Sequence, residues 1–324
     1  MKLIYTVCTA SYLYQAFSLG DSIKKTNPDY ELIICLTDKM PEVNFPIPYK
    51  ILPVESINFP ALEEYSQKFS IIELACAFKP IFAFYLLKSY PSLEKLIYLD
   101  TDIYLYDSLV GIEKNLDEHD IILTPHITKA IPLSERWNEK QYLNAGLYNA
   151  GFIAFKRTEN SLKFLDWWQT HLNKYGYLDY CKGMGADQLC LNFVPVFYEK
   201  VLVDYNPSLN IAYWNLQERE LSFVDGKYFV NQNTPLVFFH FSGYNPDKPT
   251  LISKHFKLPK NRSQKALKQI IKEYRTELIK NHFIDLKGII PAYGIYTIPP
   301  KEKHPIVKFI EKSAWKVINY VENY

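Results

Sequence analysis

The chain has 324 residues, of which 48% are hydrophobic and 22% are charged, a balance that can bury a large core and argues against a disordered or low-complexity protein. Its formal net charge of +2 argues against a generic binder of polyanions, so no nucleic-acid partner is expected. The charge is unevenly spread, because residues 251–324 contain 15 Lys and Arg against 6 Asp and Glu, whereas residues 1–250 contain 22 against 29.

The first elements in chain order predict a βαβ unit. Residues 3–8 and 31–36 are strand-like apolar runs, and residues 14–25 between them carry apolar side chains at helical spacing. Two strands joined by a helix imply a parallel sheet with a right-handed crossover. Residues 71–89 predict a long helix that is either kinked or restarted at Pro80, and residues 96–99 predict a third buried strand.

The later elements are less regular. Residues 120–124, 151–155 and 236–241 predict strands, residues 161–171 predict an amphipathic helix, and another helix is expected to begin at residue 186. Residues 40–62 and 127–148 predict irregular connections. Because no repeat or linker interrupts the body, we expect one doubly wound α/β domain over residues 1–250 and a basic helical extension over residues 251–324.

Features that would direct the chain to other compartments are missing from the sequence. The apolar start reads as a strand rather than a signal peptide, and no apolar run approaches the ~18 residues of a spanning helix. The five cysteines are scattered, and their spacing fits neither a zinc site nor a disulfide framework. These features favour a cytoplasmic protein.

The strongest chemical signal is a pair of carboxylates, Asp100 and Asp102, directly after the third predicted strand. Ligand sites of parallel sheets lie beyond the carboxyl ends of the strands, and two such carboxylates suit Mn²⁺ or Mg²⁺. His240, at the end of a late strand, can complete this metal site. After it, Gly243 permits close approach of the backbone to a phosphate, and Lys248 can neutralise the phosphate charge. Taken singly, the aspartates could be solvated acids and His240 a hydrogen-bonded histidine in a turn. The combination of the Asp pair with His240 favours the metal site.

Two further motifs carry open alternatives. Asp187 and Gln188 stand at a predicted helix start, where Asp187 is either an N-cap or a ligand of sugar hydroxyls with Gln188 beside the reacting carbon. Asn149 and Gly151 precede a predicted strand, where small residues either leave room for a ligand or form an ordinary turn.

In this order, the motifs resemble the GT-A nucleotide-sugar glycosyltransferases, and most of all glycosyltransferase family 8, the group of glycogenin and the bacterial lipopolysaccharide galactosyltransferases. The resemblance covers roughly residues 1–250 and implies a Rossmann-like, mostly parallel sheet with helices on both faces. It rests on Thr9-Ala10-Ser11, Lys79, Tyr98-Leu-Asp100-Thr-Asp102, Asn149-Ala-Gly151, Asp187-Gln188, His240-Phe-Ser-Gly243 and Lys248-Pro249.

The resemblance implies a role for each matched residue. The nucleotide pocket would be lined by Thr9, Ala10 and Ser11, with Asn149, Gly151 and Gly243 also at the donor. The diphosphate would be met by Lys79 and Lys248, and Mn²⁺ or Mg²⁺ would be held by Asp100, Asp102 and His240. The donor sugar would be contacted by Asp187 and Gln188, the catalytic candidates. The gap between His240 and Lys248 is wider than in the family. Residues 127–148 have no clear counterpart and are assigned to the acceptor site.

The reaction that the resemblance implies is transfer of a hexose from a nucleotide diphosphate sugar, with UDP expected, to a glycan or glycolipid acceptor with retention. Retention by double displacement needs Asp187 as nucleophile, and same-face attack with the leaving phosphate as base is the alternative. A second interpretation is a non-catalytic nucleotide-sugar or glycan-binding protein on the same fold. A nucleotidyltransferase is disfavoured, because the residues after the first strand lack both glycine and a basic residue.

The basic extension contains two predicted amphipathic helices, at residues 261–282 and 305–321. In the second, Lys308, Lys312 and Lys316 recur every four residues beside an apolar stripe. Peripheral contact with the inner face of a membrane and docking on the domain are both compatible with this pattern.

Overall fold

The computed structural model describes residues 1–132, 139–256, 265–294 and 305–322, which form an α/β architecture around a seven-stranded sheet. Its strand order is β10-β6-β7-β4-β1-β2-β3, and β7 runs antiparallel to both neighbours while the other pairings are parallel. This mostly parallel sheet confirms the Rossmann-like α/β class expected from the sequence. The strands are β1 Lys2–Cys8, β2 Glu31–Leu36, β3 Lys50–Pro53, β4 Lys95–Leu99, β6 Ile121–Pro125, β7 Tyr148–Lys156 and β10 Val201–Val203.

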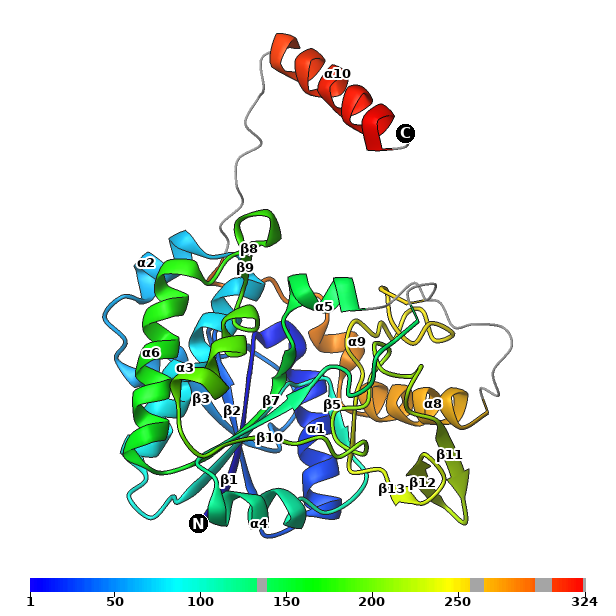
Figure 1. Cartoon of the computed structure of the whole chain (residues 1–324). Coiled ribbons are helices and arrows are strands. Elements are labelled where there is room, and N and C mark those ends of the chain that lie inside the picture. Colours follow the sequence, from blue (N-terminus) through cyan, green and yellow to red (C-terminus); the bar gives the residue numbers. More distant parts are fainter. Residues whose placement is uncertain (133–138, 257–264, 295–304, 323–324) are drawn as a thin grey trace.

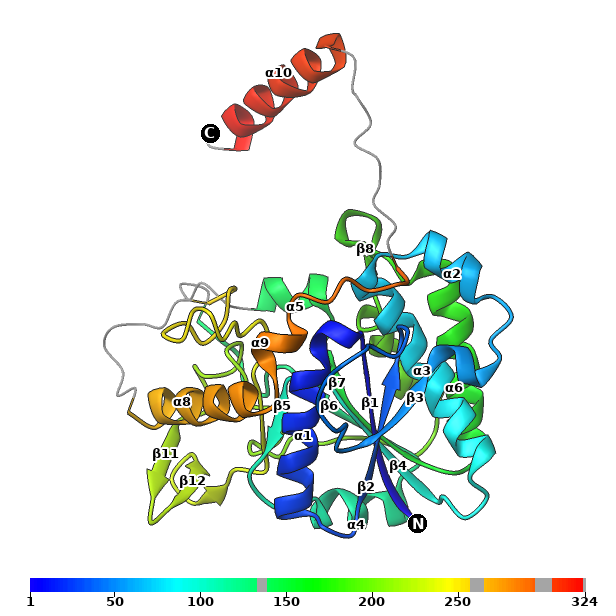
Figure 2. The same ribbon diagram turned by 180° about the vertical axis from the view of Figure 1, so that it is seen from behind.

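Helices cover both faces of the sheet, as Figures 1 and 2 show from opposite sides. One face carries α1 (Leu13–Thr26), α4 (Val110–Glu118) and α8 (Lys265–Lys280), and the other carries α3 (Ile71–Ser89) and α6 (Glu159–Tyr175). Each layer of helices buries its own apolar cluster against the sheet. The sheet therefore lies between two cores, and its strand ends remain available for a site.

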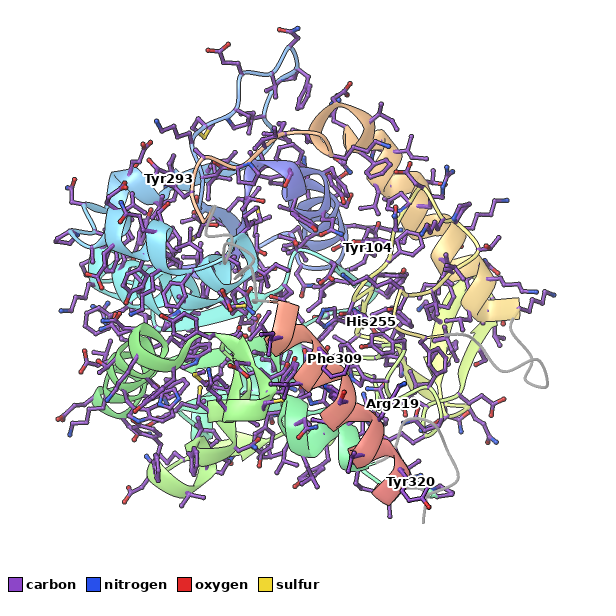
Figure 3. The ribbon with its side chains drawn as sticks, turned by 90° about the horizontal axis from the view of Figure 1, so that it is seen from above. Tyr104, Arg219, His255, Tyr293, Phe309 and Tyr320 are labelled. Carbon is purple, nitrogen blue, oxygen red and sulfur yellow. The ribbon has the colours of Figure 1, made fainter. Side chains whose placement is uncertain are left out.

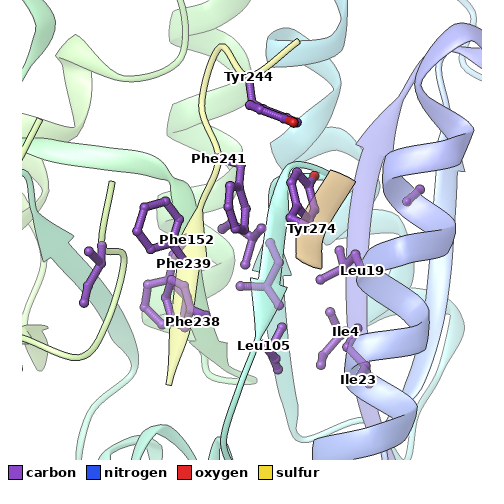
Figure 4. Close-up of a cluster of buried hydrophobic side chains, with 14 of the residues drawn as sticks. Ile4, Leu19, Ile23, Leu105, Phe152, Phe238, Phe239, Phe241, Tyr244 and Tyr274 are labelled. Atoms are coloured by element: carbon purple, nitrogen blue, oxygen red, sulfur yellow. The ribbon is translucent and has the colours of Figure 1, made fainter. Parts of the chain in front are cut away.

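An aromatic cluster on the α1 side anchors the strand that carries His240 (Figure 4). This strand, β14 (Phe238–His240), pairs antiparallel with β5 (Ile103–Leu105), which follows the Asp100–Asp102 turn. Phe238 lies 5.4 Å from Phe152 between ring centroids, and Phe241 stacks on Tyr274 of α8 at 3.8 Å. Burial of each ring contributes roughly 1.5–3 kcal/mol, so the position of β14 is strongly determined.

Helix α3 is continuous from Ile71 to Ser89, and no new helix begins at Pro80. Its start is secured by a capping box, in which Ser70 accepts from the backbone of Glu73 and the Glu73 carboxylate accepts from the backbone of Ser70. Ten of its residues are buried, so packing compensates for the hydrogen bond that proline removes.

Several predicted elements differ from the structure. The connection expected at residues 127–148 contains the short helix α5 (Glu139–Ala145), while residues 133–138 lie outside the described residues. The helix expected from residue 186 is instead a 3₁₀ turn, Leu189–Phe193, followed by α7 (Val194–Phe197). The irregular stretch at residues 40–62 contains β3, a 3₁₀ turn (Val54–Ile57) and the start of α2 (Leu62–Lys68). Further small strand pairings lie outside the main sheet. Strand β8 (Leu178–Asp179) pairs with β9 (Met184–Gly185), and β12 (Lys227–Val230) pairs with both β11 (Leu221–Val224) and β13 (Thr234–Pro235).

The two helices expected in the basic extension are both present. The first, α8, buries Leu267, Ile270 and Tyr274 against the α1 side of the body and is followed by α9 (Phe283–Leu286), which joins the same core; the expected start of α8, residues 261–264, lies outside the described residues. The second, α10 (Pro305–Glu322), exposes large apolar side chains, including Phe309 and Tyr320 (Figure 3). Among the described helices, none combines the length and apolar character that crossing a membrane requires.

Candidate functional site

The site lies at the carboxyl edge of the sheet, where β4 ends at Leu99. The backbone N–H of Asp100 donates to Gly151 O on β7 (2.8 Å), and the register of β14 on β5 sets His240 opposite Ile103. The N–H of Phe241 also donates to Asp102 O (2.8 Å). Backbone pairing therefore brings the histidine to the two aspartates across 138 positions of the chain, counted from Asp102 to His240.

The three candidate metal ligands meet in space as the sequence predicted. His240 Nε2 lies 2.9 Å from Asp102 Oδ1 and 3.8 Å from Asp100 Oδ2, and one donor atom from each residue lies within 4.8 Å of the others. The other oxygen of Asp100 is occupied, because Oδ1 accepts from the Tyr98 hydroxyl and lies 3.0 Å from Lys79 Nζ. Asp100 therefore presents Oδ2, and two carboxylates with one imidazole form a donor set that fits a divalent cation.

Gly151 lets these ligands pack directly against the backbone of β7. A Cβ at this position would lie 2.4 Å from His240 Cε1 and 2.8 Å from Asp100 Oδ2. The backbone of Gly151 has no positive φ that would itself demand glycine. Glycine at this position is thus explained by the close approach of the His240 and Asp100 side chains, which any larger residue would displace.

The charges of the site favour a cation. Burial alone would lower the pKa of His240, but the Asp102 and Asp100 carboxylates outweigh it and raise that pKa. Burial would raise the pKa of Asp100, but Lys79, His240 and the Tyr98 hydroxyl together lower it. A metal ion would therefore take the place of a proton on His240 Nε2.

Lys79 lies behind the metal site as a buried cation between two acids. Its ammonium is 2.7 Å from Asp187 Oδ2 and 3.0 Å from Asp100 Oδ1, and it donates to Ala150 O (3.2 Å). Burial would lower the pKa of Lys79, but these carboxylates hold it well above its ordinary value. Three protein oxygens thus surround the Lys79 ammonium, and a direct contact of Lys79 with diphosphate stays a prediction that requires this arrangement to change.

Replacement of Lys79 by methionine is expected to destabilise the fold by about 3–5 kcal/mol, because it leaves Asp187 and Asp100 without their buried counter-charge. Urea unfolding at pH 7 measures this loss. Lys88→Met, an exposed position on the same helix, is the control and should change stability by less than about 1 kcal/mol. Equal effects of the two substitutions would contradict the buried ion-pair assignment.

Asp187, Gln188 and Asn149 converge beside Lys79. Asp187 does not act as a helix cap, since its carboxylate pairs with Lys79, and its backbone O accepts from the indole N–H of buried Trp168 (3.1 Å). Gln188 Oε1 accepts from Asn149 Nδ2 (3.0 Å) and from Ala150 N (3.1 Å). The two motifs that the sequence left open therefore belong to one cluster.

Thr9, Ala10 and Ser11 lie where β1 ends, one strand away from Asp100. The hydroxyls of Thr9 and Ser11 are 3.0 Å apart, and Ala10 N donates to the buried Asp38 carboxylate (3.1 Å). Their contact with a nucleotide stays a prediction.

Gly243 and Lys248 lie in the turns after β14. Gly243 has a φ of +69°, and a Cβ there would lie 2.9 Å from Ser253 Oγ and from His255 Cδ2, so glycine is required by the backbone itself. Lys248 is exposed, and no ion pair among the described residues ties it to the Asp100–His240 cluster. The phosphate roles of both residues remain predictions.

Sequence reasoning assigned no role to four polar residues at this edge: Tyr98, Thr124, His126 and Asn210. Each is buried, and each is linked to a site residue directly or through another of the four. Tyr98 stands in the Tyr98-Leu-Asp100-Thr-Asp102 motif without a role of its own, and the other three belong to no motif, although the polar Asn210 between apolar Leu209 and Ile211 is a weak signal.

The stability of the protein is expected to fall between pH 6.5 and pH 4 because of His126. Burial lowers the pKa of His126 to about 4, and its Nε2 faces the amide of Asn149 at 3.3 Å. The unfolded chain takes up this proton near pH 6.5 and the folded chain only near pH 4, so acid favours unfolding, by about 2 kcal/mol at pH 5.

Urea unfolding at pH 7 and pH 5 measures this loss, which should shrink in His126→Gln. His119→Gln, at the end of α4, is the control and should keep the wild-type difference. An unchanged pH difference in His126→Gln would assign the acid sensitivity to other groups.

Comparisons with known proteins place the chain by fold rather than by family. No known family profile matches it. Two uncharacterised Bacillus subtilis proteins are similar: YfnF is 28% identical over 74% of this chain and 80% of its own length, and YfnD is 22% identical over 94% and 97%. Among solved structures, the bifunctional glycosyltransferase WbbM superposes with a TM-score of 0.51 at 15% identity, over 87% of this chain and about half (51%) of WbbM. The chain thus shares its fold with a glycosyltransferase structure.

Proposed function

We propose that this protein is a metal-dependent glycosyltransferase of the family 8 type. It transfers a hexose from a nucleotide diphosphate sugar, probed first as UDP-hexose, to a hydroxyl of a glycan or glycolipid acceptor with retention. The observation that carries the proposal is the meeting of Asp100 Oδ2, Asp102 and His240, packed against Gly151 at the carboxyl edge of a GT-A-type sheet. Likeness in fold to a glycosyltransferase structure supports the reaction class.

In the proposed reaction, Asp100, Asp102 and His240 would hold Mn²⁺ or Mg²⁺. A divalent ion at this position supplies charge neutralisation for the leaving diphosphate. Lys248, from the turn after β14, adds positive charge to the same group. Thr9, Ala10 and Ser11 hold the nucleoside at the end of β1.

Asp187 and Gln188 orient the donor sugar in this proposal. The Asp187 carboxylate is buried and ion-paired with Lys79 at 2.7 Å, which makes it a weak nucleophile. Gln188 is held at both ends of its amide, since it also donates to Ala145 O (2.7 Å). This arrangement favours same-face attack over a covalent intermediate on Asp187.

The test is release of nucleotide from a panel of UDP-, GDP- and ADP-sugars by purified protein with Mn²⁺, with and without EDTA. Release from one donor that EDTA abolishes is the expected result. A folded protein that binds a nucleotide with Mn²⁺ but releases none, even with added acceptors, would instead be a non-catalytic nucleotide-sugar binder. Absence of both release and metal-dependent binding would overturn the proposal.

We further propose that α10 makes a peripheral contact with the inner face of a membrane, near a glycolipid acceptor. Phe309 and Trp315 are 71% and 63% exposed on this helix, whose sequence also carries a lysine every four residues from Lys308 to Lys316. Anionic lipid attracts such lysines by about 1 kcal/mol each. Co-sedimentation with phosphatidylglycerol vesicles at low salt is expected, with phosphatidylcholine vesicles as the control. Lack of sedimentation with the anionic vesicles would remove the membrane contact.

A further inference from the structure

We propose that Asn210 is the positioning residue of the metal site, because its amide oxygen holds the Nδ1–H of His240 and so leaves the Nε2 lone pair for the metal. The inference rests on the metal site of the proposed function and adds a residue that touches no substrate. Asn210 Oδ1 lies 3.0 Å from His240 Nδ1, and its side chain is almost fully buried. What determines the direction of this bond is a chain of three amides that begins at the backbone.

The first amide, that of Gln188, is oriented by backbone groups at both ends. Ala150 N–H can only donate, and it faces Gln188 Oε1 at 3.1 Å. Ala145 C=O can only accept, and it faces Gln188 Nε2 at 2.7 Å. The oxygen and nitrogen of the Gln188 amide therefore have one arrangement that satisfies both neighbours.

The second amide, that of Asn149, follows from the first. Gly151 N–H donates to Asn149 Oδ1 at 3.0 Å, and Asn149 Nδ2 donates to Gln188 Oε1 at 3.0 Å. Reversing the Asn149 amide would set two donors against each other at Gly151 and two acceptors against each other at Gln188. Its oxygen is thus directed toward Asn210.

The third amide, that of Asn210, uses both of its N–H groups as donors. Nδ2 donates to Asn149 Oδ1 at 3.0 Å and to Thr124 Oγ1 at 2.9 Å. Asn210 Oδ1 must then face His240 and accept from Nδ1–H. A neutral imidazole with its hydrogen on Nδ1 has its lone pair on Nε2, the atom that lies beside Asp100 and Asp102.

The backbone around Asn210 is also shaped for this role. Asn210 has a φ of +55°, a left-handed conformation that asparagine tolerates better than most residues. The N–H of His240 donates to the C=O of the adjacent Ile211 at 2.7 Å, so the two residues are joined through both backbone and side chain. Gln188 is the first amide of this chain, and it is also assigned to the donor sugar. One network therefore orients both a metal ligand and a sugar-binding residue.

Histidine ligands of metals generally donate their second N–H to such a partner, and loss of that partner weakens metal binding roughly 10–100-fold. We expect this loss in Asn210→Gly, which removes the amide and remains compatible with the positive φ. Asn210→Asp sets its second oxygen against Asn149 Oδ1 and should lose stability, but it keeps an oxygen that accepts from His240 Nδ1–H and should bind the metal more tightly than Asn210→Gly by about 10-fold.

Mn²⁺ affinity, measured from the electron paramagnetic resonance signal of free Mn²⁺, is the readout, with urea unfolding of each variant alongside. Asn27→Ala is the matched control: Asn27 is also buried and hydrogen-bonded to backbone, but it closes α1 at the end away from the site. It should lose stability with little change in Mn²⁺ affinity. In the Zn²⁺-loaded wild type, histidine ¹⁵N spectra should show the His240 hydrogen on Nδ1, with His240→Gln assigning the signal.

The outcomes separate the inference from the proposed function. A folded wild type that binds no Mn²⁺ overturns the metal site and the inference together. A wild type that binds Mn²⁺, with Asn210→Gly binding it equally well, overturns only the inference, as does a His240 ring in Zn²⁺-loaded protein with its hydrogen on Nε2.

Discussion

Replacing Asp102 by alanine is expected to abolish metal-dependent release of nucleotide from the donor, with a fall of about 10³-fold or more in turnover. The substitution removes one of three metal ligands and the carboxylate nearest to His240 Nε2, at 2.9 Å. Asp100 cannot compensate, because its Oδ1 is already held by Lys79 and Tyr98. Nucleotide release at saturating donor, together with Mn²⁺ affinity, measures the effect.

Asp107→Ala is the matched control for Asp102→Ala. Asp107 is an exposed aspartate after β5, and its carboxylate accepts only from the nearby Ser108 N–H among the described residues. This variant should retain wild-type turnover and Mn²⁺ affinity. Near-normal activity in Asp102→Ala would refute the metal assignment, and a matching loss in both variants would point to an effect of net charge.

Much of the frame of the site follows from local sequence patterns. The apolar runs and helical spacing predict β1, α1, β2, α3 and β4 with bounds that agree within one or two residues. Since the carboxyl ends of parallel strands share one edge, the position of Asp100 and Asp102 after β4 predicts where the site lies. His240 also ends a predicted strand, but it reaches the aspartates through the antiparallel pairing of β14 with β5, outside the parallel sheet.

Local sequence patterns do not predict which side chains contact each other across the fold. Asn210 acts on His240 through a bond between residues 30 positions apart, and it is oriented by Asn149, 61 positions away. Lys79 points from the middle of α3 at two carboxylates on other segments. Such contacts depend on how the segments pack. The short helix α5 was missed because seven residues show too little periodicity to predict a helix.

Gly151→Ala is expected to weaken metal binding strongly although it adds a single methyl group. The new Cβ would lie 2.4 Å from His240 Cε1, 2.8 Å from Asp100 Oδ2 and 2.8 Å from Asn149 Oδ1. Relief of these contacts requires His240 or the Asp100 carboxylate to move, and their positions are set by strand pairing and by Lys79. We expect Mn²⁺ affinity to fall by about 100-fold. Overpacking should also lower stability by about 1–3 kcal/mol.

Gly111→Ala separates this effect from the general consequences of replacing glycine. Gly111 lies in the first turn of α4, and a Cβ there would meet no atom within 4 Å. Alanine at this position should raise stability by about 0.5–1 kcal/mol and leave Mn²⁺ affinity unchanged. If Gly151→Ala instead keeps wild-type metal binding while losing stability, then Gly151 serves packing and the metal lies elsewhere. If it loses metal binding while its cooperative unfolding is retained, the positions of His240 and Asp100 against Gly151 are what the metal requires.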